Sequence, residues 1–214
     1  MVKVQQLMEE IETKGGLTPA KKVRETAERF PELIAMREKN FGIWEEITYK
    51  QYWEQAQWIG CALNYYGVET QDSVAIHSEN RPEWFISDVA IQAIGAVSVV
   101  LYPTNPPSEV SYLIGHSESK ILFAEDQEQV DKALEVIEEL PELKKIIYFE
   151  PRGLTTYESP LLMAWEEFLQ IGKEEFEKNP NFVTDKLDLI EPEDVAIMVY
   201  TSGTTGPPKG SMIT

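Results

Sequence analysis

The sequence contains one cysteine and two histidines in 214 residues. A single thiol excludes an internal disulfide framework and any zinc site made of cysteines, and it is typical of a reducing compartment. We expect Cys61 to pack as a small apolar side chain. His77 and His116 have no paired carboxylate pattern around them, so we interpret both as structural histidines. Motifs of zinc proteases and serine hydrolases are also missing, so several common catalytic centres are excluded.

Long hydrophobic runs are missing as well. Acidic residues stand among the apolar positions of residues 1–16, which is unlike a signal peptide. The most apolar region, residues 89–102, contains Gln92 and Gly95 and falls short of the roughly 20 residues that span a bilayer. We therefore expect a cytoplasmic protein with no transmembrane segment.

Positive charge is scarce and unevenly placed. The chain has 19 Lys and Arg residues against 37 Asp and Glu residues, a formal net charge of −18. Such a charge repels nucleic acid, which we exclude as a partner, and anionic lipid. Acids are concentrated in residues 125–194, whereas residues 195–214 contain no acid and a single base, Lys209. A lone cation without neighbouring acids is expected where a polyanion binds.

The middle of the chain alternates between strand and helix patterns. We expect strands at residues 73–76, 97–102, 121–124 and 146–149, and helices at residues 82–95, 108–116 and 127–140. This alternation predicts βαβ units with right-handed crossovers, and so an α/β fold with a layered, mostly parallel sheet and flanking helices. The helix after Pro82 is apolar around much of its circumference and should be deeply buried. Asn80 or Arg81 before Pro82 is explained by capping of its start.

We divide the chain into four parts. Residues 1–70 should form N-terminal helices and a hairpin, and residues 71–150 a βαβ-repeating subdomain with a parallel sheet. Residues 151–194 are acidic and less periodic, and we interpret them as a surface excursion with one helix at 160–171. Residues 195–214 should form a buried strand and a phosphate-binding loop.

The first part carries clear local signals. Thr18 and Pro19 predict the start of a helix that ends near Arg29, and residues 33–39 and 43–48 read as the hairpin. Thr48 can cap a second helix that Gly67 ends. Its apolar face carries an aromatic stripe that we assign to the core, made of Tyr52, Ala56, Ile59, Leu63 and Tyr66.

The most informative stretch is YTSGTTGPPKG at residues 200–210. Its glycines allow backbone N–H groups to turn inward as a concave nest for phosphate oxygens, and its hydroxyls and Lys209 add donors. The spacing differs from a Walker A loop, because Pro208 precedes the lysine and Gly210 follows it. Since Gly203, Gly206 and Gly210 provide hinges, we expect this loop to be mobile without nucleotide.

The string TSGTTGPPKG resembles the signature loop of the adenylate-forming, or AMP-binding, superfamily. The resemblance implies that the loop holds the β- and γ-phosphates of ATP, and that Lys209 and Thr204 take part in catalysis. The binding residues carried over from this motif are Thr201, Ser202, Gly203, Thr204, Thr205, Gly206 and Lys209. Ser211 departs from the small apolar residue more usual there, and the chain stops at Thr214, where the superfamily usually continues with a histidine.

Residues 78–123, beginning SENRPEW, resemble the long-chain fatty acyl-CoA synthetases. The resemblance covers about residues 15–214, the incomplete N-terminal domain of such a synthetase. It implies an AMP-forming ligase of lipid metabolism that uses fatty acid, ATP, Mg²⁺ and coenzyme A. It leaves open a homo-oligomer and a peripheral membrane contact in the full enzyme.

Later motifs of that family have no counterpart in these residues, so we expect the chain to be inactive alone. Two other interpretations stay open. One is another adenylating enzyme, of the aryl-CoA ligase or carboxylic acid reductase type. The other is a non-catalytic nucleotide-binding or interaction fragment. We also expect the last strand to lack its sheet neighbours and to leave an open edge.

Overall fold

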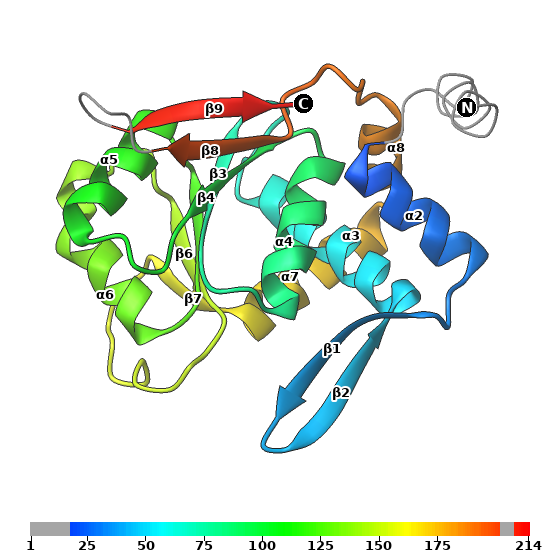
Figure 1. Cartoon of the computed structure of the whole chain (residues 1–214), viewed down its shortest axis with the longest axis horizontal. Coiled ribbons are helices and arrows are strands. Elements are labelled where there is room, and N and C mark those ends of the chain that lie inside the picture. The colour runs from blue at the N-terminus through cyan, green and yellow to red at the C-terminus, as the bar shows by residue number, and fades with distance from the viewer. Residues whose placement is uncertain (1–17, 202–207) are drawn as a thin grey trace.

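The structure is a computed structural model that describes residues 18–201 and 208–214. Its centre is a seven-stranded sheet in the order β7-β6-β5-β3-β4-β8-β9 (Figure 1). The strands are β3 (Ser73–His77), β4 (Val97–Leu101), β5 (Ile121–Ala124), β6 (Lys145–Tyr148), β7 (Leu162–Ala164), β8 (Ile197–Thr201) and β9 (Lys209–Ile213). Every neighbouring pair is parallel except β8 and β9. The predicted α/β fold with a mostly parallel sheet is confirmed.

Helices cover both faces of this sheet (Figure 1). They are α2 (Pro19–Arg29), α3 (Tyr49–Tyr65), α4 (Pro82–Ala93), α5 (Pro107–Ser117), α6 (Gln127–Glu135), α7 (Trp165–Lys178) and α8 (Phe182–Asp188), with a 3₁₀ turn at Ile137–Glu139. Strand β5 shows how the faces are separated, because successive side chains of a strand point to opposite sides. Phe123 belongs to the hydrophobic cluster that includes residues of α3, α4, α7 and α8, whereas Leu122 belongs to the cluster that includes residues of α5 and α6.

The helix starts follow from local sequence. The Thr18 hydroxyl accepts a hydrogen bond from the Lys21 N–H at 3.3 Å, and Thr48 forms a reciprocal capping box with Gln51. Gly67, just after α3, has a φ of 76°, which glycine adopts without steric cost. The predicted caps and ends of α2 and α3 are confirmed, and so is the burial of most of the aromatic stripe.

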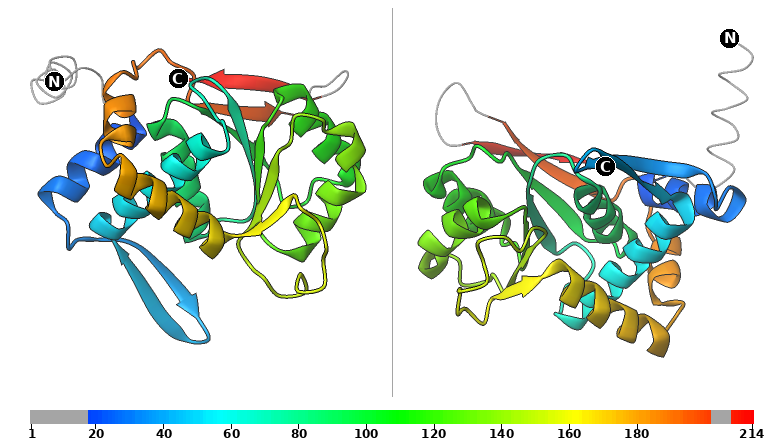
Figure 2. Two further views of the ribbon diagram at one scale, coloured as in Figure 1. Left: turned by 180° about the vertical axis from the view of Figure 1, so that it is seen from behind. Right: turned by 90° about the horizontal axis from the view of Figure 1, so that it is seen from below.

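The predicted hairpin is also present. Strands β1 (Ile34–Asn40) and β2 (Ile43–Thr48) pair antiparallel, and the turn between them places Phe41 and Gly42 at positive φ. Figure 2 shows the hairpin projecting from the body of the molecule. It pairs with no strand of the main sheet among the described residues.

Residues 151–194 differ from the expected surface excursion. The segment contributes strand β7 to the sheet, followed by α7 and α8, and the expected helix at 160–171 begins only at Trp165. Trp165, Phe168, Val183 and Leu187 are buried in the larger core. Acidic residues lie between these apolar positions, so the amphipathic pattern of the helices was not recognised from the sequence.

Helix α4 departs from prediction at its start. Its N-cap, Arg81, makes no side-chain capping hydrogen bond. Instead, its guanidinium binds both carboxylate oxygens of Glu83, at 2.8 and 3.0 Å, and lies over the Phe149 ring. Phe85 is 41% exposed, so this part of α4 is not deeply buried. The preference of Pro82 for the first helical turn is enough to explain the start.

Candidate functional site

Strand β8 ends where the glycine-rich motif begins, and β9 starts where it finishes. Thr201 pairs with Lys209, and Tyr200 pairs with Gly210. The antiparallel β8–β9 hairpin therefore brings the two sides of the motif together. Because β8 is parallel to β4, this point lies at the carboxyl end of parallel strands, where ligands of α/β sheets bind.

The prediction that the strand before the motif lacks its sheet neighbours was wrong for β8. The strand has β4 on one side and β9 on the other, so in the described residues β7 forms one edge of the sheet and β9 forms the other. Met212 and Ile213 on this edge strand are 67% and 49% exposed, and apolar surface is therefore open there. The sequence did not reveal β9, because a lysine, a glycine and a serine begin it and none of them favours a strand.

The predicted site residues fall into two groups. Thr201 and Lys209 are described, exposed and paired across the hairpin. The other five lie outside the described residues: Ser202, Gly203, Thr204, Thr205 and Gly206. The prediction that their loop is mobile concerns these same residues and is therefore not tested.

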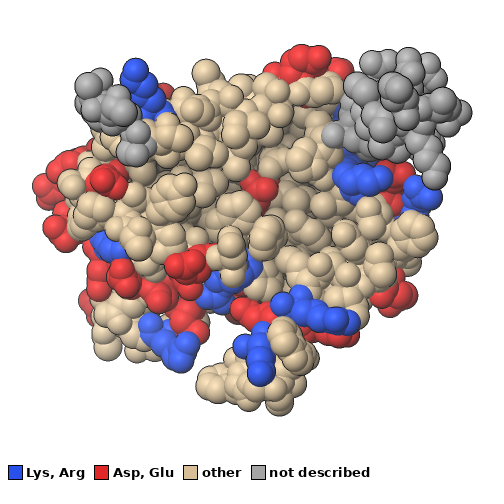
Figure 3. All heavy atoms as spheres, viewed as in Figure 1, with Lys and Arg blue, Asp and Glu red and all other residues tan. Residues whose placement is uncertain are grey.

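Lys209 is in strand β9 and not in a loop. Its side chain is exposed and forms no ion pair within residues 18–201 and 208–214. The surface over β8 and β9 shows mostly uncharged side chains, whereas acids gather over α5 and α6 (Figure 3). The ammonium group is therefore available to an anion, and the backbone of Lys209 is fixed in a strand.

Gly210 was expected to be a hinge of the loop, but it lies in strand β9. A Cβ at this position would lie 2.9 Å from Met198 Sδ and 3.3 Å from the Tyr200 ring. Real Cβ atoms essentially never come closer than 3.0 Å to such neighbours. The glycine thus lets β9 run close beside the side chains of β8.

Three functional candidates were missed by sequence reasoning: Tyr112, His116 and Tyr200. The Tyr112 hydroxyl donates to the Pro208 carbonyl oxygen at 3.0 Å. His116 Nδ1 and the Tyr200 hydroxyl share a hydrogen bond of 2.8 Å. The i, i+4 spacing of Tyr112 and His116 was the available signal, since such residues face the same way on a helix.

A small cavity of about 230 Å³ lies beneath the hairpin. It is lined by Val100, Tyr102, Asn105, Glu109, Leu113, Tyr200 and Pro208. Inside it, the Asn105 amide donates to the Glu109 carboxylate. A carboxylate disfavours a phosphate in this cavity, so the side of the hairpin that carries Lys209 is the better place for an anion.

His77 lies at the carboxyl end of β3 and is fully buried. Its Nε2 is 3.0 Å from the Tyr102 carbonyl oxygen, and Nδ1 has no hydrogen-bond partner in the described part of the chain. Burial, reinforced by the nearby Lys132, lowers the pKa of His77 to about 4. The neutral ring thus joins β3 to the segment after β4, as a structural histidine would.

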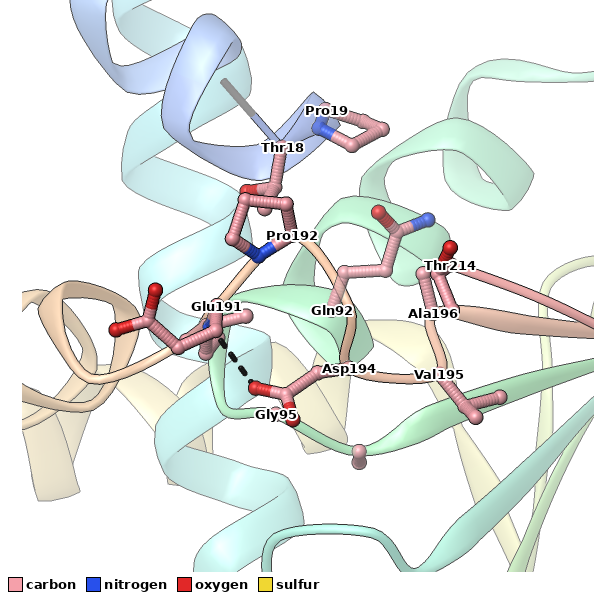
Figure 4. Close-up of a pocket in the computed structure, with 12 residues that line it drawn as sticks. Thr18, Pro19, Gln92, Gly95, Glu191, Pro192, Asp194, Val195, Ala196 and Thr214 are labelled. Atoms are coloured by element: carbon pink, nitrogen blue, oxygen red, sulfur yellow. Dashed lines mark hydrogen bonds between the residues drawn. The ribbon is translucent and has the colours of Figure 1, made fainter. Parts of the chain in front are cut away.

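Two further features carry no sign of phosphate chemistry. Cys61 is buried as predicted, and burial raises the pKa of its thiol to about 11. The cavity in Figure 4, of about 200 Å³, lies near Gly95 and Val195, at the amino ends of β4 and β8. There the Glu191 N–H donates to Asp194 Oδ2 at 2.9 Å, and the described residues that line the cavity include no Lys or Arg.

Two absences concern only the described residues. They contain no group of three or more His, Cys, Asp or Glu side chains that could hold a metal ion. A search of their helices finds none with the length and apolar character needed to cross a bilayer.

Comparison with known proteins places this geometry in context. The family described as AMP-binding enzyme matches residues 23–214. The long-chain-fatty-acid–CoA ligase ACSBG2 of Xenopus laevis is 34% identical over 194 residues, and the match covers 89% of this chain and 25% of that protein. The human long-chain-fatty-acid–CoA ligase ACSBG1 is 33% identical over 194 residues, covering 88% of this chain and 25% of that protein. The chain thus spans about a quarter of the length of these curated relatives.

Among solved structures, one from Rhodopseudomonas palustris CGA009, provisionally assigned as a long-chain-fatty-acid CoA ligase, superposes with a TM-score of 0.69 at 21% identity. The match covers 92% of this chain and 44% of that one. At this identity the likeness shows a shared fold, and the fold here corresponds to one part of a longer chain.

Proposed function

Because this chain belongs to the AMP-binding enzyme family, we propose that it is the N-terminal, phosphate-binding part of an ATP-dependent long-chain-fatty-acid–CoA ligase. The observation that carries the proposal is the β8–β9 hairpin at the carboxyl end of a parallel strand. Beside the glycine-rich motif it presents Lys209, whose side chain forms no ion pair with another described residue. Identity above 30% to fatty-acid–CoA ligases over most of the chain favours this acid class over aryl acids.

In the proposed reaction, a fatty acid carboxylate attacks the α-phosphorus of ATP, and the bond to the bridging oxygen breaks. The products are an acyl-adenylate and pyrophosphate. The coenzyme A thiol, losing its proton, then attacks the acyl carbonyl carbon and displaces AMP. The residues of this chain act in the first step, because Lys209 is positioned to offset negative charge on the departing pyrophosphate.

Mg²⁺ belongs to the proposal through the family alone. When bound, it would neutralise phosphate charge. The described residues offer no cluster that could hold it. We assign it no ligand in this chain. A cytoplasmic location, a peripheral membrane contact and a homo-oligomer are likewise part of the proposal.

Replacing Lys209 with alanine tests the proposal. We expect the variant in the complete enzyme to lose the roughly 1.5 to 3 kcal/mol of a charged hydrogen bond in transition-state binding, or about tenfold or more in ATP–pyrophosphate exchange. Lys50→Ala is the matched control, because Lys50 is also exposed but lies at the start of α3. Melting temperatures should match for both variants. Equal exchange rates for the two variants would contradict the role of Lys209.

A further inference from the structure

Helix α5 contacts both sides of the β8–β9 hairpin through two side chains one turn apart. Tyr112 donates to the carbonyl of Pro208, on the side that leads into β9. His116 bonds to the Tyr200 hydroxyl, on the side that leaves β8. Tyr112 and His116 are outside the glycine-rich motif, and nothing in the proposed reaction requires them to touch substrate.

The rings of Tyr112, His116 and Tyr200 also pack together. The centroids of Tyr112 and His116 are 5.4 Å apart, and Tyr200 stands edge-on to them at 6.4 and 5.8 Å. Tyr200 is only 6% exposed, so these contacts are sheltered from water. We name this group, Tyr112, His116, Tyr200 and Pro208, the α5 clamp.

The hairpin needs such a support for a structural reason. Strand β9 is one of the two edge strands of the described sheet, and there it pairs only with β8. Pro208 has no N–H to donate, so its carbonyl is its one backbone hydrogen-bonding group. Edge segments with few hydrogen bonds open at low free-energy cost. Without the α5 clamp, pairing with β8 would be the remaining hydrogen-bonded support of Lys209 among the described residues.

We propose that Tyr112 and His116 are positioning residues, which hold the two strands of the hairpin so that Lys209 meets the di- or triphosphate group in a fixed geometry. The inference rests on the proposed function. It predicts that loss of either hydrogen bond weakens phosphate binding while leaving the fold intact.

The test uses the 214-residue chain and inorganic pyrophosphate as the probe. Tyr112→Phe removes the hydroxyl and keeps the ring, and His116→Ala removes the second hydrogen bond. His116→Asn is the rescue variant, because its amide group comes close to the position of Nδ1. Tyr157→Phe is the matched control. The Tyr157 hydroxyl donates to Asp131 Oδ1 over 2.6 Å, and neither residue belongs to the hairpin.

Binding is measured by calorimetry and stability by thermal melting. We expect Tyr112→Phe and His116→Ala to weaken pyrophosphate binding by about two- to tenfold, the effect of one neutral hydrogen bond, with His116→Asn restoring most of it. Tyr157→Phe should bind like the wild type. If Tyr112→Phe and Tyr157→Phe bind equally well, the inference is overturned.

Amide hydrogen exchange separates this inference from the proposed function. If the wild-type chain binds no pyrophosphate, the proposed function fails. The amide exchange rates of residues 200, 201, 209 and 210 then test the α5 clamp separately. Faster exchange there in Tyr112→Phe, but not in Tyr157→Phe, supports the clamp. Exchange that is the same in both variants refutes it.

Discussion

Replacing Gly172 with alanine should destabilise the protein by forcing α3 and α7 apart. A Cβ on Gly172 would lie 1.9 Å from the Trp58 carbonyl oxygen and 2.5 Å from its carbon. These atoms belong to the backbone of α3 and cannot rotate away. The two helices would have to separate by more than about 1 Å, which a close-packed interior resists.

The size of the effect follows from two opposing terms. Overpacking costs about 1 to 3 kcal/mol, and contact with rigid backbone places this case near about 3 kcal/mol. Alanine is better than glycine in a helix by about 1 kcal/mol, so the net loss is about 2 kcal/mol. With a urea dependence of about 2 kcal/mol per molar, the unfolding midpoint should fall by about 1 M.

Gly115→Ala provides the control for this measurement. Gly115 is also helical, in α5, but a Cβ there meets only Leu140 Cδ2 at the ordinary distance of 3.8 Å. We expect an unfolding midpoint in urea equal to or above that of the wild type. If Gly172→Ala is as stable as Gly115→Ala, then α7 does not pack closely on α3, and our account of residues 165–178 is refuted.

Three further outcomes are expected. Burial lowers the pKa of His77 to about 4, from about 6.5 in the unfolded chain. Between these values the unfolded chain binds more protons, so the contribution of His77 to the free energy of unfolding is complete above pH 6.5 and falls by on the order of 3 kcal/mol toward pH 4. Urea unfolding of His77→Gln should depend less on pH over this window, and identical dependence would contradict the assignment. Cys61, with a pKa near 11, should react with a thiol reagent only as fast as the protein opens, and rapid labelling of the native chain would disprove its burial. The 214-residue chain with MgATP, coenzyme A and palmitate should form no thioester, because catalysis by positioning is lost when one reactant is not held; robust turnover would refute this.

Local signals in the sequence predicted a large part of the fold. The caps at Thr18 and Thr48 and the alternation of strands and helices through residues 73–148 depend on neighbouring residues, so they can be read without tertiary information. The glycine-rich motif was recognisable for the same reason. Its identity lies in a contiguous string.

Tertiary structure decided the role of residues 151–194. The high acidity of the segment suggested a solvated excursion, but Trp165 and Phe168 face the core while the acids lie on the other side of α7. Net charge over a segment does not reveal which face its apolar residues share, and the close approach of Gly172 to Trp58 appears only when α3 and α7 are in place.

The surroundings of the motif also required the structure. The string at residues 201–209 by itself led to the prediction of anion-binding chemistry, since the candidate donors are contiguous in the sequence. Only the folded chain shows that Lys209 begins an edge strand. It alone also shows that Tyr112 and His116 of α5 contact the hairpin, because these two contacts join residues more than eighty positions apart. Such long-range contacts depend on how the strands are ordered in the sheet, and a local pattern carries no information about that order.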